Sequence, residues 1–176
     1  LAALDAGLPN LLRHVSNIKN VYGLPAVVAL NRFPTDTQAE VELVMARCGE
    51  LGVNVVLSDA WAEGGRGAAA LAEEVVRLCD EEKPDFRFAY ELGGSIEEKI
   101  EAVVKKVYGG SGISVSDEAK AQIERLSALG LSEMPVCIAK TQYSFSDDKT
   151  LLGAPENFTV SVKSVKVSAG AGFIVV

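Results

Sequence analysis

The chain has one histidine and three cysteines among its 176 residues. A lone histidine, His14, cannot by itself assemble a catalytic triad or a metal site, so we interpret it as a structural or surface residue. Cys48, Cys79 and Cys137 lie far apart and show neither a CxxC pair nor metal-ligand spacing. We therefore expect three buried free thiols rather than a cysteine-based metal site.

Long apolar runs and basic clusters are also missing. No segment approaches the roughly 18 uninterrupted apolar residues of a membrane helix. The formal net charge is −7 and the basic side chains are scattered, whereas nucleic-acid binding needs a clustered basic face. We expect a cytoplasmic protein without a membrane or nucleic-acid partner.

A Walker-type phosphate loop is not recognisable either. The glycine-rich segment Gly64–Gly67 lacks the GxxxxGK[ST] spacing, and we interpret it as a flexible turn that could shape a neighbouring pocket. The chain also starts at Leu1 rather than at methionine and finishes in an apolar, strand-like segment, Gly172–Val176. We expect it to be a piece of a larger polypeptide.

Residues 1–83 alternate helical and strand patterns, which predicts an α/β portion with a mainly parallel sheet flanked by helices. The first strand is continuously apolar and is typical of a central strand covered on both faces. Thr35 with Gln38, or Thr37 with Glu40, can form a capping box before the second helix. Three helices are expected: one that begins near Pro9, one with the apolar stripe Val41 to Cys48, and one with the apolar stripe Ala68 to Cys79. The expected strands are Pro25–Leu30 and Val53–Leu57.

Residues 84–176 have a different character and predict a smaller α+β C-terminal portion. Ser95 with Glu98 forms another capping box, and a one-residue slip in the alternation near Lys163 predicts a bulge or bend. The expected helices are 96–107 and 119–129, and the expected strands are 113–115, 135–139, 158–167 and the segment after Gly172.

Two aromatic residues follow the two expected strands of the first portion. Phe33 and Trp61 stand among polar and glycine residues, where no apolar stripe is available for them to join. In open α/β sheets, ligands bind in the crevice at the carboxyl ends of the strands. The pattern favours two aromatic faces around a flat heterocycle, with a plain packing role as the open alternative.

Polar residues near these strand ends allow further interpretations. Asn31 resembles the start of the NKxD element with which GTPases read guanine, but Arg32 follows it and the first acid is Asp36. A GTPase-like nucleotide switch is therefore an alternative with a weak motif, and Asn31 can equally be a turn residue. Gln142 and Ser144 lie in a long polar loop and could either bind ligand or decorate its surface.

Several segments in the same order resemble formate-tetrahydrofolate ligase, also called formyltetrahydrofolate synthetase. These segments are NRFPTDT (31–37), LSDAWAEGG (57–65), IEEKI (96–100), MPVCIAKTQYSFSDD (134–148) and VSAGAGFIV (167–175). The similarity covers essentially the whole chain and corresponds to the C-terminal portion of that family. It implies part of a P-loop NTPase-like ligase, with the remaining N-terminal part of the polypeptide as a partner.

The resemblance also implies an activity. Members of the family use ATP and Mg²⁺ to activate formate as formyl phosphate, which the N10 amine of tetrahydrofolate attacks to give 10-formyltetrahydrofolate. The implied substrates are formate, tetrahydrofolate and ATP, and the implied assembly is a homotetramer. We expect no tightly bound cofactor on this chain alone, and no catalysis by it, because the phosphate-binding residues are missing.

Site residues follow from the same resemblance. It implies that Phe33 and Trp61 are the aromatic walls around the pterin ring, with Leu57 as an apolar contact. It further places Asn31, Arg32, Thr35 and Asp36 where nucleotide and folate meet, and Gln142 and Ser144 are assigned to the same cleft. A non-catalytic folate-binding or assembly module is the alternative from a different functional class.

Overall fold

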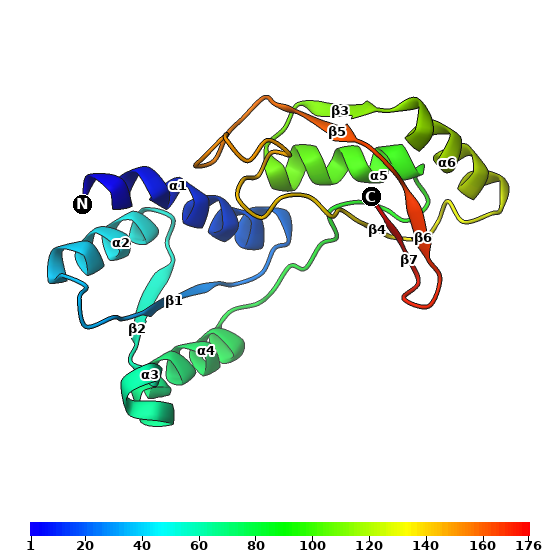
Figure 1. Ribbon diagram of the computed structural model, residues 1–176. Helices are drawn as coiled ribbons and strands as arrows, with labels where there is room; N and C mark the ends of the chain where they lie inside the picture. The colour runs from blue at the N-terminus through cyan, green and yellow to red at the C-terminus, as the bar shows by residue number, and fades with distance from the viewer. The chain divides into compact units, whose positions relative to one another are not determined.

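A computed structural model describes all residues, 1–176, and divides them into two compact units, Leu1–Arg87 and Phe88–Val176. Each unit combines helices with short parallel strands, so the predicted α/β fold class is confirmed (Figure 1). None of the helices has the length and apolar character that crossing a membrane requires.

Unit 1 is built around one pair of parallel strands. Val27 pairs in register with Asn54, and Asn31 pairs with Ser58 at the other end. Its elements are α1 (Ala2–Ser16), the π-helical turn η1 (Asn17–Val21), β1 (Val27–Asn31), α2 (Gln38–Glu50), β2 (Asn54–Ser58), α3 (Ala60–Glu63), the 3-10 turn η2 (Gly64–Ala68) and α4 (Ala69–Glu81).

The core of unit 1 lies where α1 and α2 pack on the strands. It contains Leu8, Val15, Val28, Val44, Cys48 and Val53. The Lys19 ammonium donates hydrogen bonds to the carbonyls of Leu51 (2.9 Å) and Gly52 (3.0 Å), which fastens η1 to the turn before β2. These contacts fix the two strands that carry the candidate site.

The first helix begins earlier than the sequence indicated. It starts at Ala2 and contains Pro9, whereas we expected a start near Pro9 itself. Proline lacks one backbone N–H and normally ends a helix. Here Leu4 and Leu8 lie before Pro9 and pack in the core of unit 1, so burial of this first turn outweighs the lost hydrogen bond.

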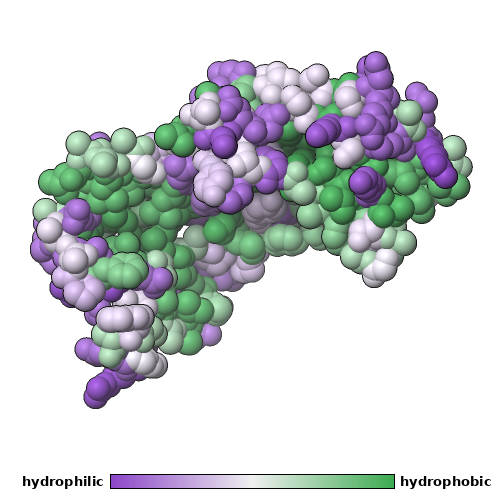
Figure 2. All heavy atoms as spheres, in the orientation of Figure 1, coloured by the Kyte–Doolittle hydropathy of each residue, from purple (hydrophilic) through white to green (hydrophobic).

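Two expectations about burial in unit 1 are wrong. β1 pairs only with β2 and exposes Ala29, so it is not a central strand covered on both faces. The helix α4 buries none of its residues, and Cys79 and Val75 on its expected stripe are exposed. The sheet of unit 1 has only two strands and is too narrow to cover the whole apolar face of α4. Apolar side chains also remain visible at the surface over α1 and beside β1 (Figure 2).

An ion-pair network ties α4 to β2. Both oxygens of Glu74 accept hydrogen bonds from Arg77, each at 2.8 Å, and one also accepts the Asn54 side-chain amide at 2.8 Å. Arg77 and Asn54 stabilise the ionised carboxylate and lower the pKa of Glu74 from 4.5 to about 2. The stabilisation is therefore fully present above pH 4.5 and is lost as the pH falls toward 2.

We expect Glu74→Gln to reduce the stability of unit 1 at neutral pH, because it removes the charge that Arg77 pairs with. The difference from wild type should shrink below about pH 4.5, where the wild-type carboxylate begins to take up a proton in the unfolded chain. Urea denaturation at pH 7, 5 and 3 measures this. Glu73→Gln, on the same helix and exposed, is the control; a gap that stays constant with pH would contradict the assignment.

Unit 2 contains two small sheets. In one, β3 runs parallel to β5; in the other, β7 lies between parallel β4 and antiparallel β6. Its elements are α5 (Ile96–Val103), the π-helical turn η3 (Val104–Tyr108), β3 (Gly112–Val115), α6 (Asp117–Ala128), β4 (Val136–Cys137), β5 (Thr159–Val162), β6 (Lys166–Ser168) and β7 (Phe173–Val175).

Helices α5 and α6 supply half of the ten buried core residues of unit 2. Its buried residues include Ile96, Ile100, Val104, Ile123, Leu126 and Ile174. Lys99 on α5 is only 1% exposed, and its ammonium donates hydrogen bonds to the carbonyls of Ser132 and Met134. Loss of hydration lowers the pKa of Lys99, and the two carbonyls hold the charge at the loop that leads into β4.

Several local predictions are confirmed. Thr37 with Glu40 forms the capping box of α2, and Ser95 with Glu98 forms that of α5. The expected strand 158–167 is interrupted near Lys163, and its two halves, β5 and β6, belong to different sheets. The expectation of three buried thiols is wrong for two of them. Cys48 is buried, whereas Cys79 and Cys137 are exposed, Cys79 because α4 buries none of its residues.

Candidate functional site

The two parallel strands of unit 1 end side by side. Asn31 closes β1 and lies opposite Ser58, which closes β2. The ladder continues for one more bond, because the Arg32 N–H donates to the Ser58 carbonyl at 3.1 Å. The segments that follow both strands therefore leave the sheet at one edge.

The segment after β1 forms a tight turn that presents Phe33. The Phe33 N–H donates to Oδ2 of Asp36 at 2.8 Å, and the Asp36 N–H donates to the Phe33 carbonyl at 3.0 Å. Directly beyond, Thr37 caps α2, and its backbone N–H donates to the Glu40 carboxylate at 2.9 Å. This bond and that from the Thr37 hydroxyl lower the pKa of Glu40. Phe33 is thus held between a strand end and a helix cap.

The segment after β2 carries Trp61 on the short helix α3. The 3-10 turn η2 then doubles back, and the Asp59 N–H donates to the Gly67 carbonyl at 3.0 Å. A Cβ on Gly67 would lie 2.4 Å from the Asp59 carbonyl oxygen, so this close approach requires glycine. The expected turn at 64–67 takes the form of a 3-10 helical turn.

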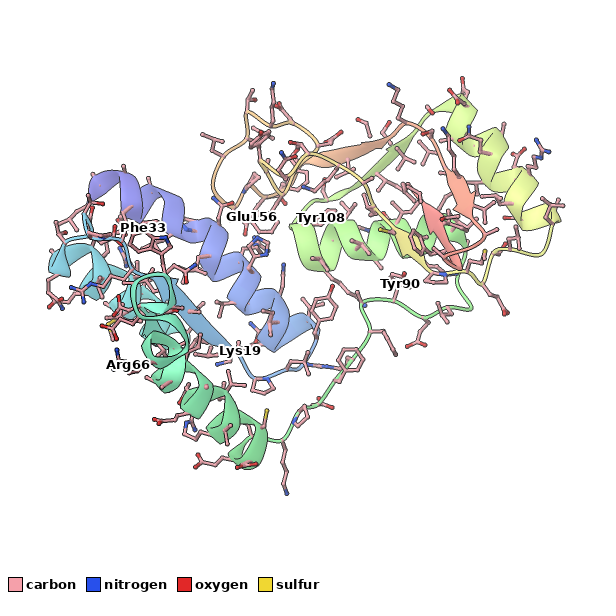
Figure 3. All side chains as sticks on the ribbon, turned by 60° about the horizontal axis from the view of Figure 1, so that its bottom comes forward. Lys19, Phe33, Arg66, Tyr90, Tyr108 and Glu156 are labelled. Carbon is pink, nitrogen blue, oxygen red and sulfur yellow. The ribbon has the colours of Figure 1, made fainter.

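Both aromatic rings project from this edge into solvent. Phe33 is 60% exposed and Trp61 is 82% exposed. The phenylalanine ring has no polar group and the tryptophan ring has only the indole N–H, so most of this exposed surface is apolar. Figure 3 shows Phe33 and Arg66, from the segments after β1 and β2, toward the same end of the sheet, with Lys19 toward the other. The rings are therefore available to a ligand and do not serve as core.

The remaining expected residues of unit 1 surround these segments. Leu57 pairs in register with Leu30 and is half-buried; Arg32 and Thr35 are exposed, and Asp36 is half-buried. A small cavity of about 180 Å³ lies under the Phe33 turn. Its lining consists of Leu4, Leu30, Asp36, Glu40, Val41 and Val44.

Gln142 and Ser144 belong to the long loop of unit 2. Gln142 is exposed, whereas Ser144 is buried. The Ser144 hydroxyl donates to the Leu151 carbonyl and accepts the Ser146 N–H at 3.0 Å. These bonds show that Ser144 organises its own loop; a contact of either residue with ligand stays a prediction.

One residue that contributes to the edge was not singled out from the sequence. The Ser58 carbonyl accepts the hydrogen bond of the Arg32 N–H. The only sequence signal of Ser58 is that a polar residue closes an apolar strand. No group of three or more His, Cys, Asp or Glu side chains in residues 1–176 gathers to hold a metal ion.

The strand-end edge thus carries the exposed rings of Phe33 and Trp61. Beside them in the chain are the amide of Asn31, the guanidinium of Arg32 and the Asp36 carboxylate, which accepts the Phe33 N–H. Such a set suits a flat, polar-edged molecule. Comparison with known families agrees with the sequence resemblance, because the family model described as formate-tetrahydrofolate ligase matches residues 1–176. The match spans the whole chain, and the chain belongs to the formate-tetrahydrofolate ligase family.

Proposed function

We propose that the chain supplies the tetrahydrofolate-binding part of an ATP-dependent ligase. The reaction joins formate to tetrahydrofolate and gives 10-formyltetrahydrofolate for cytoplasmic one-carbon metabolism. The observation that carries this proposal is the pair of exposed rings, Phe33 and Trp61, on segments that leave the paired strands β1 and β2 at one edge.

The roles of the residues follow from the chemistry of a pterin. The ring system is flat and apolar on its faces, so Phe33 and Trp61 stack on it, and Leu57 packs against its rim. Its edge carries hydrogen-bond donors and acceptors, which Asn31, Arg32, Thr35 and Asp36 orient beside the nucleotide. We assign Gln142 and Ser144, in the polar loop of unit 2, to nucleotide or substrate binding.

The phosphate chemistry needs residues from elsewhere in the polypeptide. Activation of formate by ATP and Mg²⁺ requires backbone amides and a lysine around the phosphates. We propose that the remaining N-terminal part of the polypeptide supplies them, that the intact enzyme is a homotetramer, and that the chain alone is inactive. The edge of β1 that does not pair with β2 supports a contribution from the N-terminal part of the polypeptide, because parallel strands normally lie between neighbouring strands and under helices.

Calorimetric titration of the chain with tetrahydrofolate, ATP and GTP tests the proposal. We expect tetrahydrofolate to bind, and formate-dependent phosphate release from ATP to occur only with the full-length polypeptide. GTP binding without tetrahydrofolate binding would overturn the proposal in favour of a nucleotide switch. Folate binding by a full-length polypeptide that releases no phosphate would overturn it in favour of a non-catalytic folate module.

A further inference from the structure

Unit 2 has a cavity of its own at the carboxyl ends of its strands. Its volume is about 260 Å³. The walls come from residues 138–141, which follow β4, from β5 with Lys163 and Ser164 behind it, and from Val176 after β7. Loops at the carboxyl ends of parallel strands are where α/β proteins bind ligands.

The cavity has an apolar floor and a polar rim. The floor consists of Ile100, Ile138, Val160, Val162 and Val176. Three charged side chains, Lys140, Lys163 and Asp147, line the rim together with the hydroxyl-bearing residues Thr141, Ser161 and Ser164. A molecule with a charged head and an apolar body would meet both surfaces.

The carboxylate on the rim is already used by the protein. Oδ2 of Asp147 accepts the Ser161 N–H at 3.0 Å, and Oδ1 accepts the Ser146 hydroxyl at 3.3 Å. Asp147 thereby covers the backbone of β5 on the edge that does not pair with β3. Asp147 also acts electrostatically on Lys140, so the rim carries two positive charges and one negative charge.

Lys140 is fixed in place. Its ammonium donates to the carbonyls of Thr141 (3.0 Å) and Ser144 and lies 4.9 Å from the centre of the Tyr108 ring, at the end of η3 (Figure 3). Partial burial lowers the pKa of Lys140. Lys163 is exposed at the mouth of the cavity and adds a second positive charge in a chain whose formal net charge is −7.

We propose that this cavity binds a small organic anion, with its carboxylate or phosphate at Lys163 and Lys140 and its apolar body on the floor. The volume lies just below the roughly 300–1,000 Å³ of pockets for drug-sized ligands, which suits a small organic acid. The cavity is lined by residues of unit 2, and neither Phe33 nor Trp61 belongs to it.

Titration of the full chain with benzoate, followed by amide chemical shifts, tests this site. Benzylamine has the same shape and the opposite charge, and inorganic phosphate is an anion without an apolar body. We expect benzoate to shift the amides of 138–141 and 160–164 and to bind at least tenfold more tightly than either comparison molecule. Lys163→Gln should weaken benzoate binding about tenfold and Lys163→Glu should abolish it, whereas Lys166→Gln, an exposed lysine outside the cavity, should not change it.

Three results would overturn the proposal. They are benzylamine binding as tightly as benzoate, phosphate binding as tightly as benzoate, and equal benzoate affinities in the Lys163→Gln and Lys166→Gln variants. Tetrahydrofolate binding, measured on the same Lys163 and Lys166 variants, should stay at the wild-type level whether or not benzoate binds. The folate site and the anion site can therefore fail separately.

Discussion

Replacing Trp61 by alanine is expected to weaken tetrahydrofolate binding by about 10- to 100-fold. Stacking of a flat heterocycle on one aromatic ring contributes about 1–3 kcal/mol, and each 1.4 kcal/mol is a tenfold change in affinity. Phe33→Ala should have an effect of the same size. If both rings hold one pterin, the two losses will not be additive, because each ring positions the ligand for the other.

The chain provides its own probe for this experiment. Trp61 is the only tryptophan, so the fluorescence of wild type and of Phe33→Ala reports directly on the indole as ligand binds. Calorimetry serves the Trp61→Ala variant. Phe86→Ala is the matched control, since it removes a ring that is 52% exposed and lies beyond α4, away from the strand-end edge. Unchanged affinity in both Phe33→Ala and Trp61→Ala would disprove the stacking assignment.

Gly23→Ala is expected to destabilise unit 1 by about 3 kcal/mol or more. Gly23 has φ +65°, and a Cβ there would lie 1.9 Å from the Asp85 carbonyl oxygen. The left-handed backbone costs a non-glycine residue about 1–2 kcal/mol. The segment 85–87 must also move away, which breaks the bonds from the Asp85 N–H to the Gly23 carbonyl (2.9 Å) and from the Arg87 N–H to the Tyr22 carbonyl (3.0 Å).

Gly52→Ala separates these two causes. Gly52 has φ +62°, but a Cβ there would meet only the Lys19 ammonium, at 3.6 Å. We expect it to lose only the backbone contribution of about 1–2 kcal/mol. Amide hydrogen exchange of β1 and β2 under increasing urea measures both variants. Equal losses at the two positions would show that the contact with Asp85 contributes nothing.

Much of the local structure was predictable because it depends on neighbouring residues. The capping boxes at Thr37 and Ser95 are short-range patterns, and the structure contains both. The bend near Lys163 follows from a slip in the alternation of apolar residues. Placement of Phe33 and Trp61 beyond two paired strands also followed from strand length and composition.

The errors concern properties that depend on distant parts of the chain. Whether Pro9 ends a helix depends on what Leu4 and Leu8 can pack against, and whether Cys79 is buried depends on the width of the sheet under α4. The close approach of Gly67 to the Asp59 carbonyl was likewise not predictable, because only the folded chain brings these residues together. No sequence pattern predicts the cavity of unit 2, because its charged rim forms only when the segment after β4, the long loop and the end of β5 come together in the fold.

Each unit encloses its own hydrophobic core: one around Val28 and Val44, the other around Ile100 and Ile174. Cooperative melting spreads through contiguous packing, so probes in each core report on the unit that contains them. Probes assigned to unit 1 measure the loss expected from Gly23→Ala, and probes assigned to unit 2 follow the second core separately.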